Sequence, residues 1–384
     1  MTPALPKTIK ALKTLDRKLS IVDIPFAERD DIKNLRPDDI ITRTLAVGLN
    51  PTDWKHAIGP WNPPGAFNVT GCDSVGEVVA VGSAVTHIKV GDRIAGFVYG
   101  AGDATNGAYA EYVRQNKNVC FVLPESMSNE EAAAFPIPHL TSLQALYLRL
   151  HLSPPSAPTA SPRTILIWGG ATAVGHHAVQ LAKLSGYTVF TTASPANHAA
   201  LRALGADAVF DYKDPRVVEK IREAAGAEGV FAAFDTPSEA GSTDQSIDSI
   251  GAQSGRVITL LPPSDASKTR RADVSVEFTL GYTLLGYAIT FAGTLSYPAM
   301  PEDNIAAGAW MANELPALLD GWDTTKGGSP KLKAPKLRVL EGGLDRIHEG
   351  LEIMQKGDYK AEKLVYKLGM KPAEVKIAVR LVGL

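Results

Sequence analysis

The hydrophobic pattern predicts mainly β-strands in the first part of the chain. Short runs of β-forming residues at 39–47, 75–82 and 90–98 stand between Gly, Pro and Asp turns. Turns at this spacing predict a compact, barrel-like β-domain. Helices are expected after it. One begins at Asn129 behind the N-cap residue Ser128, and a longer one runs from about Leu140 to Leu150.

The rhythm changes after a proline-rich connector at 153–162. From Arg163 onward, short apolar strands alternate with helices, which predicts a parallel, doubly wound sheet and an α/β fold. Strands are expected at 165–168, 187–193, 208–212, 230–236 and 256–261. The tail, with a helix at 343–355 and a strand at 363–367, is predicted to return to the first domain. We therefore expect one domain at 1–155, completed by 340–384, and a second at 156–339.

The first strand of this second domain ends in an unusual glycine turn. The strand 165–168 runs into Gly169-Gly-Ala-Thr-Ala-Val-Gly175 and then into an amphipathic helix. Gly169 and Gly170 allow a tight turn, and Gly175 lets the helix pack close to the strand. Backbone N–H groups at the helix start then face a pyrophosphate, which predicts a dinucleotide site. The residues expected there are Thr172, Ala173, Val174 and Gly175.

Length and composition fit a two-domain protein of the reducing cytosol. The 384 residues suffice for two cores, and a net charge of −2 gives no reason to expect nucleic acid or an anionic membrane as partner. Two cysteines exclude a disulfide scaffold. The run 278–301 is uncharged and long enough to span a bilayer, but Gly and Pro interrupt it. We expect strand-plus-helix packing around a buried pocket there, and a soluble, cytoplasmic protein.

Five short motifs in order carry a resemblance to a known superfamily. They are Leu49–Lys55, Gly71–Gly82, Val90–Gly96, Gly107–Tyr112 and the glycine turn. With them the chain resembles the medium-chain dehydrogenase/reductases over nearly its whole length. The resemblance implies a GroES-like β-rich catalytic domain at 1–155 and a Rossmann-type NADPH-binding domain at 156–339.

Further segments make the chain most similar to the fungal trans-acting enoyl reductases, which serve polyketide synthases without a working reductase domain. The segments are Leu184–Val189, Thr192–Asn197, Leu204–Pro215, Leu260–Pro262 and Glu341–Leu344. The implied partner is the acyl-carrier domain of a polyketide synthase, or of a polyketide synthase–peptide synthetase hybrid. The complex is expected to be transient, and the enzyme a monomer or a homodimer.

The zinc ligands of many relatives are missing from this chain. Zinc-bearing members carry Cys in the first motif and His-Glu after the glycine of the second, whereas this chain has Asn50 and Cys72-Asp73. A catalytic zinc needs three protein ligands, so we expect no metal. Loss of the Lewis acid disfavours alcohol dehydrogenation and favours direct hydride transfer to an activated double bond.

The end of the second strand favours NADPH over NADH. An NAD-preferring site places Asp or Glu there, whereas this segment has Ser194 and Asn197, which can donate hydrogen bonds to a 2′-phosphate. Ser194-Pro195 also reads as a plain helix cap, and both roles are compatible. With the resemblance, the cofactor-binding residues are expected to include Asn50, Pro51, Thr52, Asp53, Ser194, Pro195, Ala196, Asn197, Tyr212, Thr259, Leu260, Lys363 and Leu364.

Two residues are the candidate catalytic groups. Lys55 is placed to polarise a thioester carbonyl or to return a proton, although a solvated surface lysine is an equally plain interpretation. Thr141 is placed to contact the carbonyl or the nicotinamide, while Asp53 is expected to order its loop. By analogy, substrate-lining residues are His139, Leu140, Thr141, Ser142, Leu143, Gln144, Ala145 and Leu146, and also Leu280, Gly281, Tyr282, Thr283 and Leu284.

These observations lead to one function and two alternatives. The first is NADPH-dependent reduction of the α,β double bond of a carrier-bound polyketide enoyl thioester. The second is a zinc-independent quinone or enone oxidoreductase that acts on free small molecules. The third is a binding-only protein of the lens-crystallin type; the retained glycine turn and the Asn50–Lys55 segment argue against it.

Overall fold

The first half of the molecule is built on a seven-stranded sheet. The computed structural model describes residues 5–322 and 329–368. The sheet has the order β17-β18-β3-β5-β6-β8, and β7 pairs with β3. Its strands are β3 (Asp39–Gly48), β5 (Asp73–Val81), β6 (Arg93–Phe97), β7 (Tyr112–Asn116), β8 (Cys120–Val122), β17 (Leu337–Leu340) and β18 (Lys363–Lys367). A smaller sheet of β1 (Thr8–Leu15), β2 (Lys18–Pro25) and β4 (Asn68–Val69) packs beside it. The β-rich first part is thus present as predicted.

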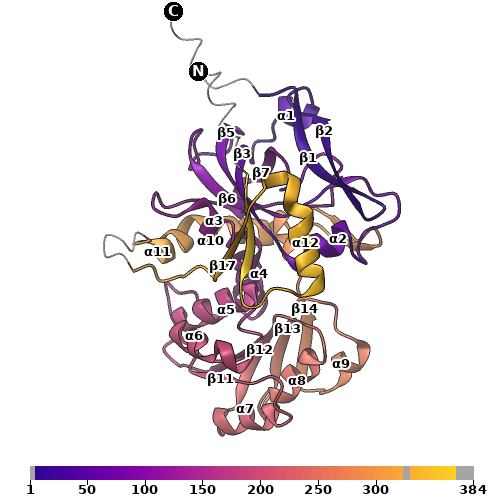
Figure 1. Ribbon diagram of the computed structural model, residues 1–384. Helices are drawn as coiled ribbons and strands as arrows, with labels where there is room; N and C mark the ends of the chain where they lie inside the picture. The colour runs from indigo at the N-terminus through magenta and orange to yellow at the C-terminus, as the bar shows by residue number, and fades with distance from the viewer. Residues whose placement is uncertain (1–4, 323–328, 369–384) are drawn as a thin grey trace, which may run out of the picture.

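The C-terminal strand returns to this sheet. β18 runs antiparallel to β3, with Val365 opposite Gly48, and β17 runs parallel to β18. Between them in sequence, α12 (Ile347–Lys356) packs against α2 (Pro51–Ala57). Figure 1 shows these yellow C-terminal elements among the indigo and purple N-terminal ones. The exact limits of the two domains stay a prediction.

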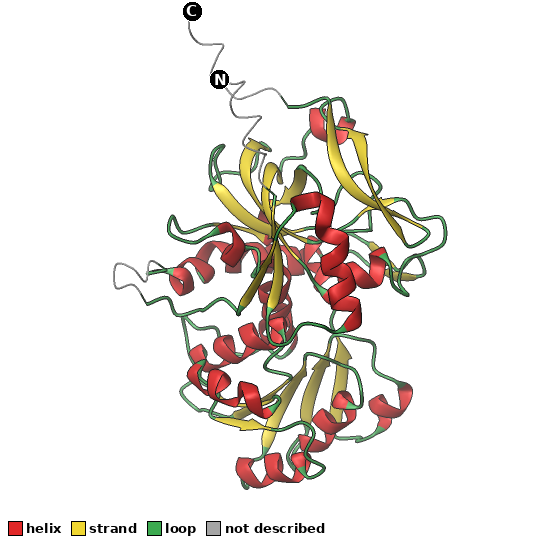
Figure 2. Cartoon of the chain, in the orientation of Figure 1, coloured by secondary structure: helices red, strands yellow, loops and turns green. Residues whose placement is uncertain are grey.

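The second half is a six-stranded parallel sheet in the order β11-β10-β9-β12-β13-β14, with helices on both faces (Figure 2). The strands are β9 (Thr164–Trp168), β10 (Thr188–Thr192), β11 (Ala208–Phe210), β12 (Val230–Asp235), β13 (Gly255–Thr259) and β14 (Val274–Phe278). Its helices are α5 (Ala173–Leu184), α6 (His198–Ala203), α7 (Val217–Ala225), α8 (Ser242–Ser249) and α9 (Asp265–Thr269). The five predicted strands are confirmed, and β14 is a sixth that the pattern did not reveal.

The predicted helix at 140–150 starts earlier than expected and changes its geometry. After α3 (Asn129–Ala132), which Ser128 caps as predicted, α4 spans Pro136–Leu143 and continues as a π-helix over Gln144–Arg149. Pro136 and Pro138 fit the first turn because that turn has no intrahelical acceptors for N–H groups. The π-helix closes with a bond of 2.9 Å from Leu150 N to Ala145 O.

The uncharged run at 278–301 does not form a membrane span. It folds into a short helical turn, η4 (Gly281–Leu285), and a hairpin of β15 (Ile289–Phe291) and β16 (Leu295–Tyr297), followed by α10 (Pro301–Asn313) and α11 (Leu315–Leu319). Within the described residues, no helix is both long and apolar enough to cross a bilayer.

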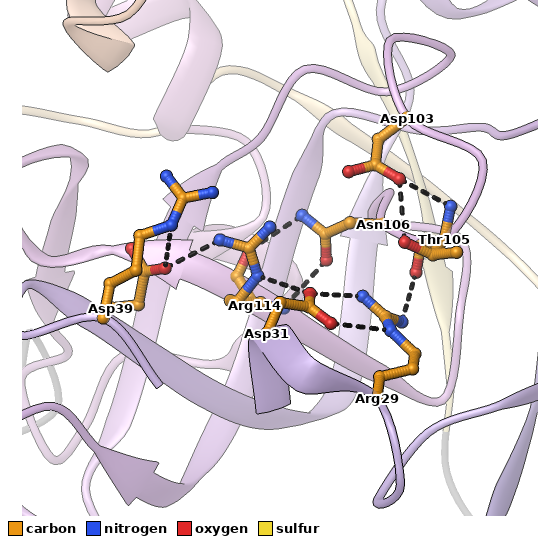
Figure 3. A network of polar contacts seen from close by, with 8 residues as sticks. Arg29, Asp31, Asp39, Asp103, Thr105, Asn106 and Arg114 are labelled. Carbon is orange, nitrogen blue, oxygen red and sulfur yellow. Dashed lines mark hydrogen bonds and ion pairs between the residues drawn. The ribbon is translucent and has the colours of Figure 1, made fainter. Parts of the chain in front are cut away.

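A polar cluster clips the short helix α1 (Asp30–Lys33) onto the first sheet (Figure 3). The Arg114 guanidinium on β7 bonds Asp39 at 2.7 Å and Asp31 at 3.1 Å. Arg29 bonds Asp31 and also donates to the Thr105 carbonyl oxygen at 2.7 Å. Because each carboxylate faces a guanidinium, the cluster fixes the outer loops without leaving a buried charge unpaired.

Candidate functional site

A large cavity lies between the two halves of the molecule. Its volume is about 1300 Å³, and its walls come from α2, α4, the glycine turn, the ends of β10, β12 and β13, η4 and the segment before β18. Of the predicted site residues, it is lined by Asn50, Pro51, Thr52, Lys55, Leu140, Thr141, Thr172, Ala173, Val174, Ser194, Asn197, Tyr212, Leu260, Leu280, Gly281, Tyr282, Lys363 and Leu364.

The glycine turn has the geometry of a cofactor cradle. Gly169 has φ +82°, and a Cβ atom added to Gly175 would lie 2.2 Å from the Gly169 carbonyl oxygen. Thr172 caps α5 by accepting a hydrogen bond of 2.9 Å from Gly175 N. The helix N-terminus therefore opens onto the cavity, where it suits an anionic pyrophosphate.

One end of the cavity offers polar and cationic groups beyond β10. Ser194 and Asn197 line it, and their side chains are joined by a bond of 3.0 Å. Tyr212, which is 43% exposed, lies two residues beyond β11, and Lys213 follows it. Lys213 is exposed and its Nζ atom lies 5.8 Å from the Tyr212 ring centroid, so its charge is available to an anion at this end.

At the other end, Thr141 and Gly281 approach each other closely. A Cβ atom added to Gly281 would lie 2.9 Å from Thr141 Oγ1. Thr141 lies on α4 and is 7% exposed. Its hydroxyl forms no hydrogen bond with another described residue, so it can donate one into the cavity that Thr141 lines.

Lys55 spans the cleft instead of facing solvent. Its Nζ atom lies 2.8 Å from Glu239 Oε1 on the loop after β12, and 4.8 Å from the Trp61 ring centroid. The Lys55 side chain is 16% exposed. The interpretation of Lys55 as a solvated surface charge is therefore wrong, because the ion pair and Trp61 hold it in the cavity wall.

A buried ion pair lies beside Asn50 and at Asp73, in the two motifs where zinc-bearing relatives carry their metal ligands. Lys363 Nζ bonds Asn50 Oδ1 at 2.6 Å and Asp73 Oδ2 at 2.9 Å, and Asp73 Oδ1 accepts a bond from Ile137 N at 2.8 Å. The Lys363 ammonium thus neutralises the Asp73 carboxylate. The described residues contain no cluster of three or more His, Cys, Asp or Glu suited to a metal, so these side chains do not fit a zinc site.

A chain of hydrogen bonds lies behind the substrate end of the wall. Tyr282 on η4 places its hydroxyl 2.8 Å from Thr52 Oγ1 and 3.2 Å from Cys72 Sγ. Thr52 Oγ1 in turn lies 3.1 Å from His56 Nδ1. Burial lowers the pKa of His56 to about 4, so its imidazole is neutral at physiological pH.

The structure keeps some predicted residues out of the cavity wall. Asp53 is buried, and its Oδ2 accepts hydrogen bonds from Asn50 N and Tyr109 Oη, which matches the loop-ordering role. Burial raises the pKa of Asp53 to about 6. His139 is fully buried, accepts a bond of 2.9 Å from Trp310 Nε1 and does not face the substrate end. Its neutral imidazole, with a pKa that burial lowers to about 3, is a packing group.

Other predicted residues support the wall from behind. Five predicted substrate-lining residues of α4 and the following π-helix are buried in the core instead: Ser142, Leu143, Gln144, Ala145 and Leu146. Gln144 Nε2 donates to Thr283 Oγ1 at 2.7 Å and to Asp303 Oδ2 at 2.9 Å, which fixes η4. Thr259, Thr283 and Leu284 are likewise buried behind the wall, and Pro195 and Ala196 are exposed beside it.

Comparison with known proteins identifies the family. The model of the alcohol dehydrogenase GroES-like domain matches residues 36–125, and that of the zinc-binding dehydrogenases matches 173–290. Trans-enoyl reductase ACTTS2 of Alternaria alternata is 37% identical over 89% of this chain and 95% of its own length. The lovastatin nonaketide synthase enoyl reductase component lovC of Aspergillus terreus is 35% identical over 86% and 89%. The chain belongs to the trans-enoyl reductases of the medium-chain dehydrogenase/reductase superfamily.

Solved structures agree on the fold. The crystal structure of CurK enoyl reductase matches with a TM-score of 0.70 at 21% identity, over 95% of this chain and 100% of that one. The GroES-like domain and the Rossmann-type domain predicted from sequence are therefore confirmed. As a member of this family, the protein is an oxidoreductase that works with a nicotinamide cofactor.

The structure adds three residues to this trans-enoyl reductase site that the sequence did not indicate. Lys213 lies beside Tyr212, Glu239 pairs with Lys55, and Trp61 stacks near Lys55. Each stands far in sequence from the group it serves or carries no motif of its own. Glu239 follows β12 and meets Lys55 on α2 only after folding, 184 positions away in sequence, so no local pattern could have found it.

Proposed function

We propose that the protein uses NADPH to reduce the α,β double bond of a polyketide enoyl thioester that a carrier domain presents to it. The observation that carries this proposal is the single cavity that joins the glycine cradle to the Thr141 and Lys55 end. It gives the nicotinamide and a bound acyl chain one shared space. The names of the relatives, trans-enoyl reductases and a polyketide synthase component, support the same reaction.

The choice of NADPH rests on the charge at the Ser194 end. Hydroxyl, amide and ammonium groups of Ser194, Asn197 and Lys213 line that end, and no carboxylate of the cavity wall stands among them. A 2′-phosphate would gain hydrogen bonds and an ion pair there, whereas the ribose of NADH would find no acid to hold its hydroxyls.

Residues of this chain would then stabilise the negative charge that builds on the thioester oxygen. NADPH, when bound, supplies the hydride for the β-carbon. Thr141 Oγ1 has a hydrogen to donate into the cavity, and Lys55 brings a positive charge to the same wall. Aromatic side chains at 61, 97 and 291 exclude water from the acyl chain, which strengthens both interactions.

The partner follows from the chemistry of the substrate. A thioester on a phosphopantetheine arm must reach a cavity that lies between the two halves of the molecule, and a long, thin arm fits such a cleft. We infer a brief encounter with the acyl-carrier domain of a polyketide synthase or a polyketide synthase–peptide synthetase hybrid.

A cofactor and substrate assay tests the proposal. The purified protein is mixed with crotonyl pantetheine and either NADPH or NADH, and loss of the reduced nicotinamide absorbance is followed. We expect turnover with NADPH, with a lower kcat/KM for NADH, and Lys213→Met should reduce the difference by about tenfold, as for loss of one ion pair of about 1.4 kcal/mol. Absence of turnover with either cofactor would refute the reaction; equal use of both by the unaltered protein would refute the cofactor assignment.

A further inference from the structure

Tyr282 is a polar group in what the sequence marks as an apolar wall. It lines the cavity, yet its ring is held by aromatic neighbours, with the Tyr99 centroid at 4.4 Å and Phe291 at 6.2 Å. Its hydroxyl joins η4, in the second half of the molecule, to Thr52 on α2, in the first. A residue that served only for packing would not need a hydroxyl group at this position. The role of Tyr282 therefore depends on which neighbour accepts its hydroxyl hydrogen.

The hydrogen-bond partners decide the direction of each bond. His56 Nδ1 lies 2.9 Å from the Thr52 carbonyl oxygen, which can only accept, so Nδ1 carries the hydrogen. Thr52 Oγ1, 3.1 Å from the same Nδ1, is therefore an acceptor toward His56. Every hydrogen then has an acceptor only if Thr52 Oγ1–H donates to the Tyr282 oxygen and Tyr282 Oη–H points to Cys72 Sγ at 3.2 Å.

This arrangement leaves the Tyr282 O–H group in only a weak hydrogen bond. A thiol sulfur is a poor acceptor, so the phenol hydrogen can turn to a ligand in the cavity at little cost. Burial raises the pKa of Tyr282 well above its usual value, so the phenol is protonated throughout the working pH range. Thr52 Oγ1–H already faces the phenol oxygen and is placed to stabilise a negative charge on it.

We propose that Tyr282 is the catalytic acid that protonates the α-carbon of the substrate. The inference rests on the proposed function. Once the β-carbon has taken up the hydride, the former double-bond electrons reside on an enolate. The Tyr282 O–H bond then breaks, its proton forms the new C–H bond at the α-carbon, and the carbonyl re-forms. The phenolate keeps the electron pair, receives the Thr52 hydrogen bond and regains a proton from water when the product leaves.

The other candidate donors are less well placed. Lys55 Nζ is engaged by Glu239 at 2.8 Å, and the His139 ring is buried against Trp310. Thr141 Oγ1 lies beside Gly281 and has no described group behind it to return a proton. Among these candidate donors, Tyr282 is the one whose hydroxyl belongs to a chain of hydrogen bonds at the cavity wall.

The stereochemistry of protonation tests the proposal. Crotonyl pantetheine is reduced with NADPH in deuterium oxide, and the configuration of the deuterated α-carbon is determined by NMR. The variants are Tyr282→Phe, Thr52→Val and the control Tyr99→Phe, whose hydroxyl donates to the Thr290 carbonyl oxygen instead. NADPH binding is followed separately by the fluorescence of the bound cofactor, without substrate.

We expect the wild type and Tyr99→Phe to give one configuration. Tyr282→Phe should bind NADPH normally, lose about 10²-fold in kcat as for removal of a general acid, and give both configurations or the opposite one. Thr52→Val should keep the configuration of the α-carbon and lower kcat. This variant tests the proposal if Tyr282→Phe fails to fold. Retention of the wild-type configuration in Tyr282→Phe, or an unchanged rate in Thr52→Val, overturns the assignment. Failure of the wild type to reduce any enoyl thioester would instead refute the proposed function.

Discussion

Single residues of this site act mainly through buried polar contacts, and Lys363 is the clearest case. Its ammonium is 3% exposed and faces Asp73, which is fully buried. The pair joins β18, β5, Asn50 at the start of α2 and the first turn of α4. The cavity wall is therefore fixed where four elements meet.

Replacing Lys363 by Met should unfold the protein more easily. The change leaves Asp73 charged and buried, which costs about 3–5 kcal/mol in the free energy of unfolding. The control is Lys367→Met on the same strand, whose exposed pair with Glu130 should contribute less than about 1 kcal/mol. Denaturant unfolding measures both. If both variants lost the same small amount of free energy of unfolding, the Lys363–Asp73 pair would not stabilise the cavity wall.

Sequence reasoning at the residue scale found the groups that lie on motifs. Asn50, Thr52 and Ser194 reach the cavity as expected, because each stands at the start of a helix or just after the end of a strand, whereas Thr141 reaches it from the C-terminal part of α4. The role of Lys363 as the counter-ion of Asp73 could not be foreseen, because the two residues lie 290 positions apart. His139 was misplaced by analogy alone, since its position on α4 turns it toward the core.

At the scale of elements, the loop between β12 and α8 closes the cleft. Ser238 and Ala240 both have φ +53°, a conformation that costs a non-glycine residue about 1–3 kcal/mol. Ser238 Oγ accepts a bond of 2.7 Å from Leu260 N, and Glu239 pairs with Lys55. The loop thus connects α2 to the nicotinamide end of the wall. The ion pair between Glu239 and Lys55 has to break when ligands enter the cleft.

Glu239→Gln should therefore let NADPH enter and leave faster. Because the Glu239 side chain is 57% exposed, the pair contributes no more than about 1 kcal/mol, which predicts a change of up to about fivefold in both rate constants. Stopped-flow fluorescence of the bound cofactor measures them. Lys268→Met, which removes an exposed pair with Asp265 elsewhere, is the control. Unchanged rates in Glu239→Gln would show that the loop does not gate the cleft.

The elements themselves were predictable where the periodicity was local. The glycine turn and five strands of the parallel sheet follow from apolar runs and glycines. β14 was missed because only Val274 of its residues is fully buried, so an edge strand of this kind gives a weak apolar signal. The start of α4 was missed because prolines usually mark breaks, although a first helical turn accepts them.

At the scale of the whole molecule, buried neutral histidines should make stability depend on pH. Burial lowers the pKa of His56 to about 4 and that of His139 to about 3, while both titrate near 6.5 when unfolded. Between these values the unfolded chain binds more protons, so the free energy of unfolding falls as the pH falls below 6.5. Asp53 acts in the opposite sense: its pKa is raised to about 6, so its contribution declines as the pH rises from 3.8.

The histidines should dominate, because His177 is buried too and its pKa also falls. From ~1.4 kcal/mol per group and pH unit, His56 and His139 should together lose about 5 kcal/mol between pH values of about 6.5 and 4.5, and Asp53 should offset about 2 kcal/mol of it. We therefore expect a net loss of at least about 3 kcal/mol, to which His177 adds in the same direction. Denaturant unfolding across this range measures it. His139→Gln keeps an acceptor for Trp310 and should lower the slope; an unchanged slope would mean that His139 is not the titrating group.

The two halves of the molecule meet at one cavity, and the central claim is that this cavity reduces a carrier-bound enoyl thioester. The most direct test compares kcat/KM with NADPH on three substrates: a crotonyl chain on an acyl-carrier domain, a free enone and a quinone. The account predicts the highest kcat/KM for the carrier-bound chain. A higher kcat/KM for the free enone or the quinone would contradict it and identify a small-molecule reductase instead.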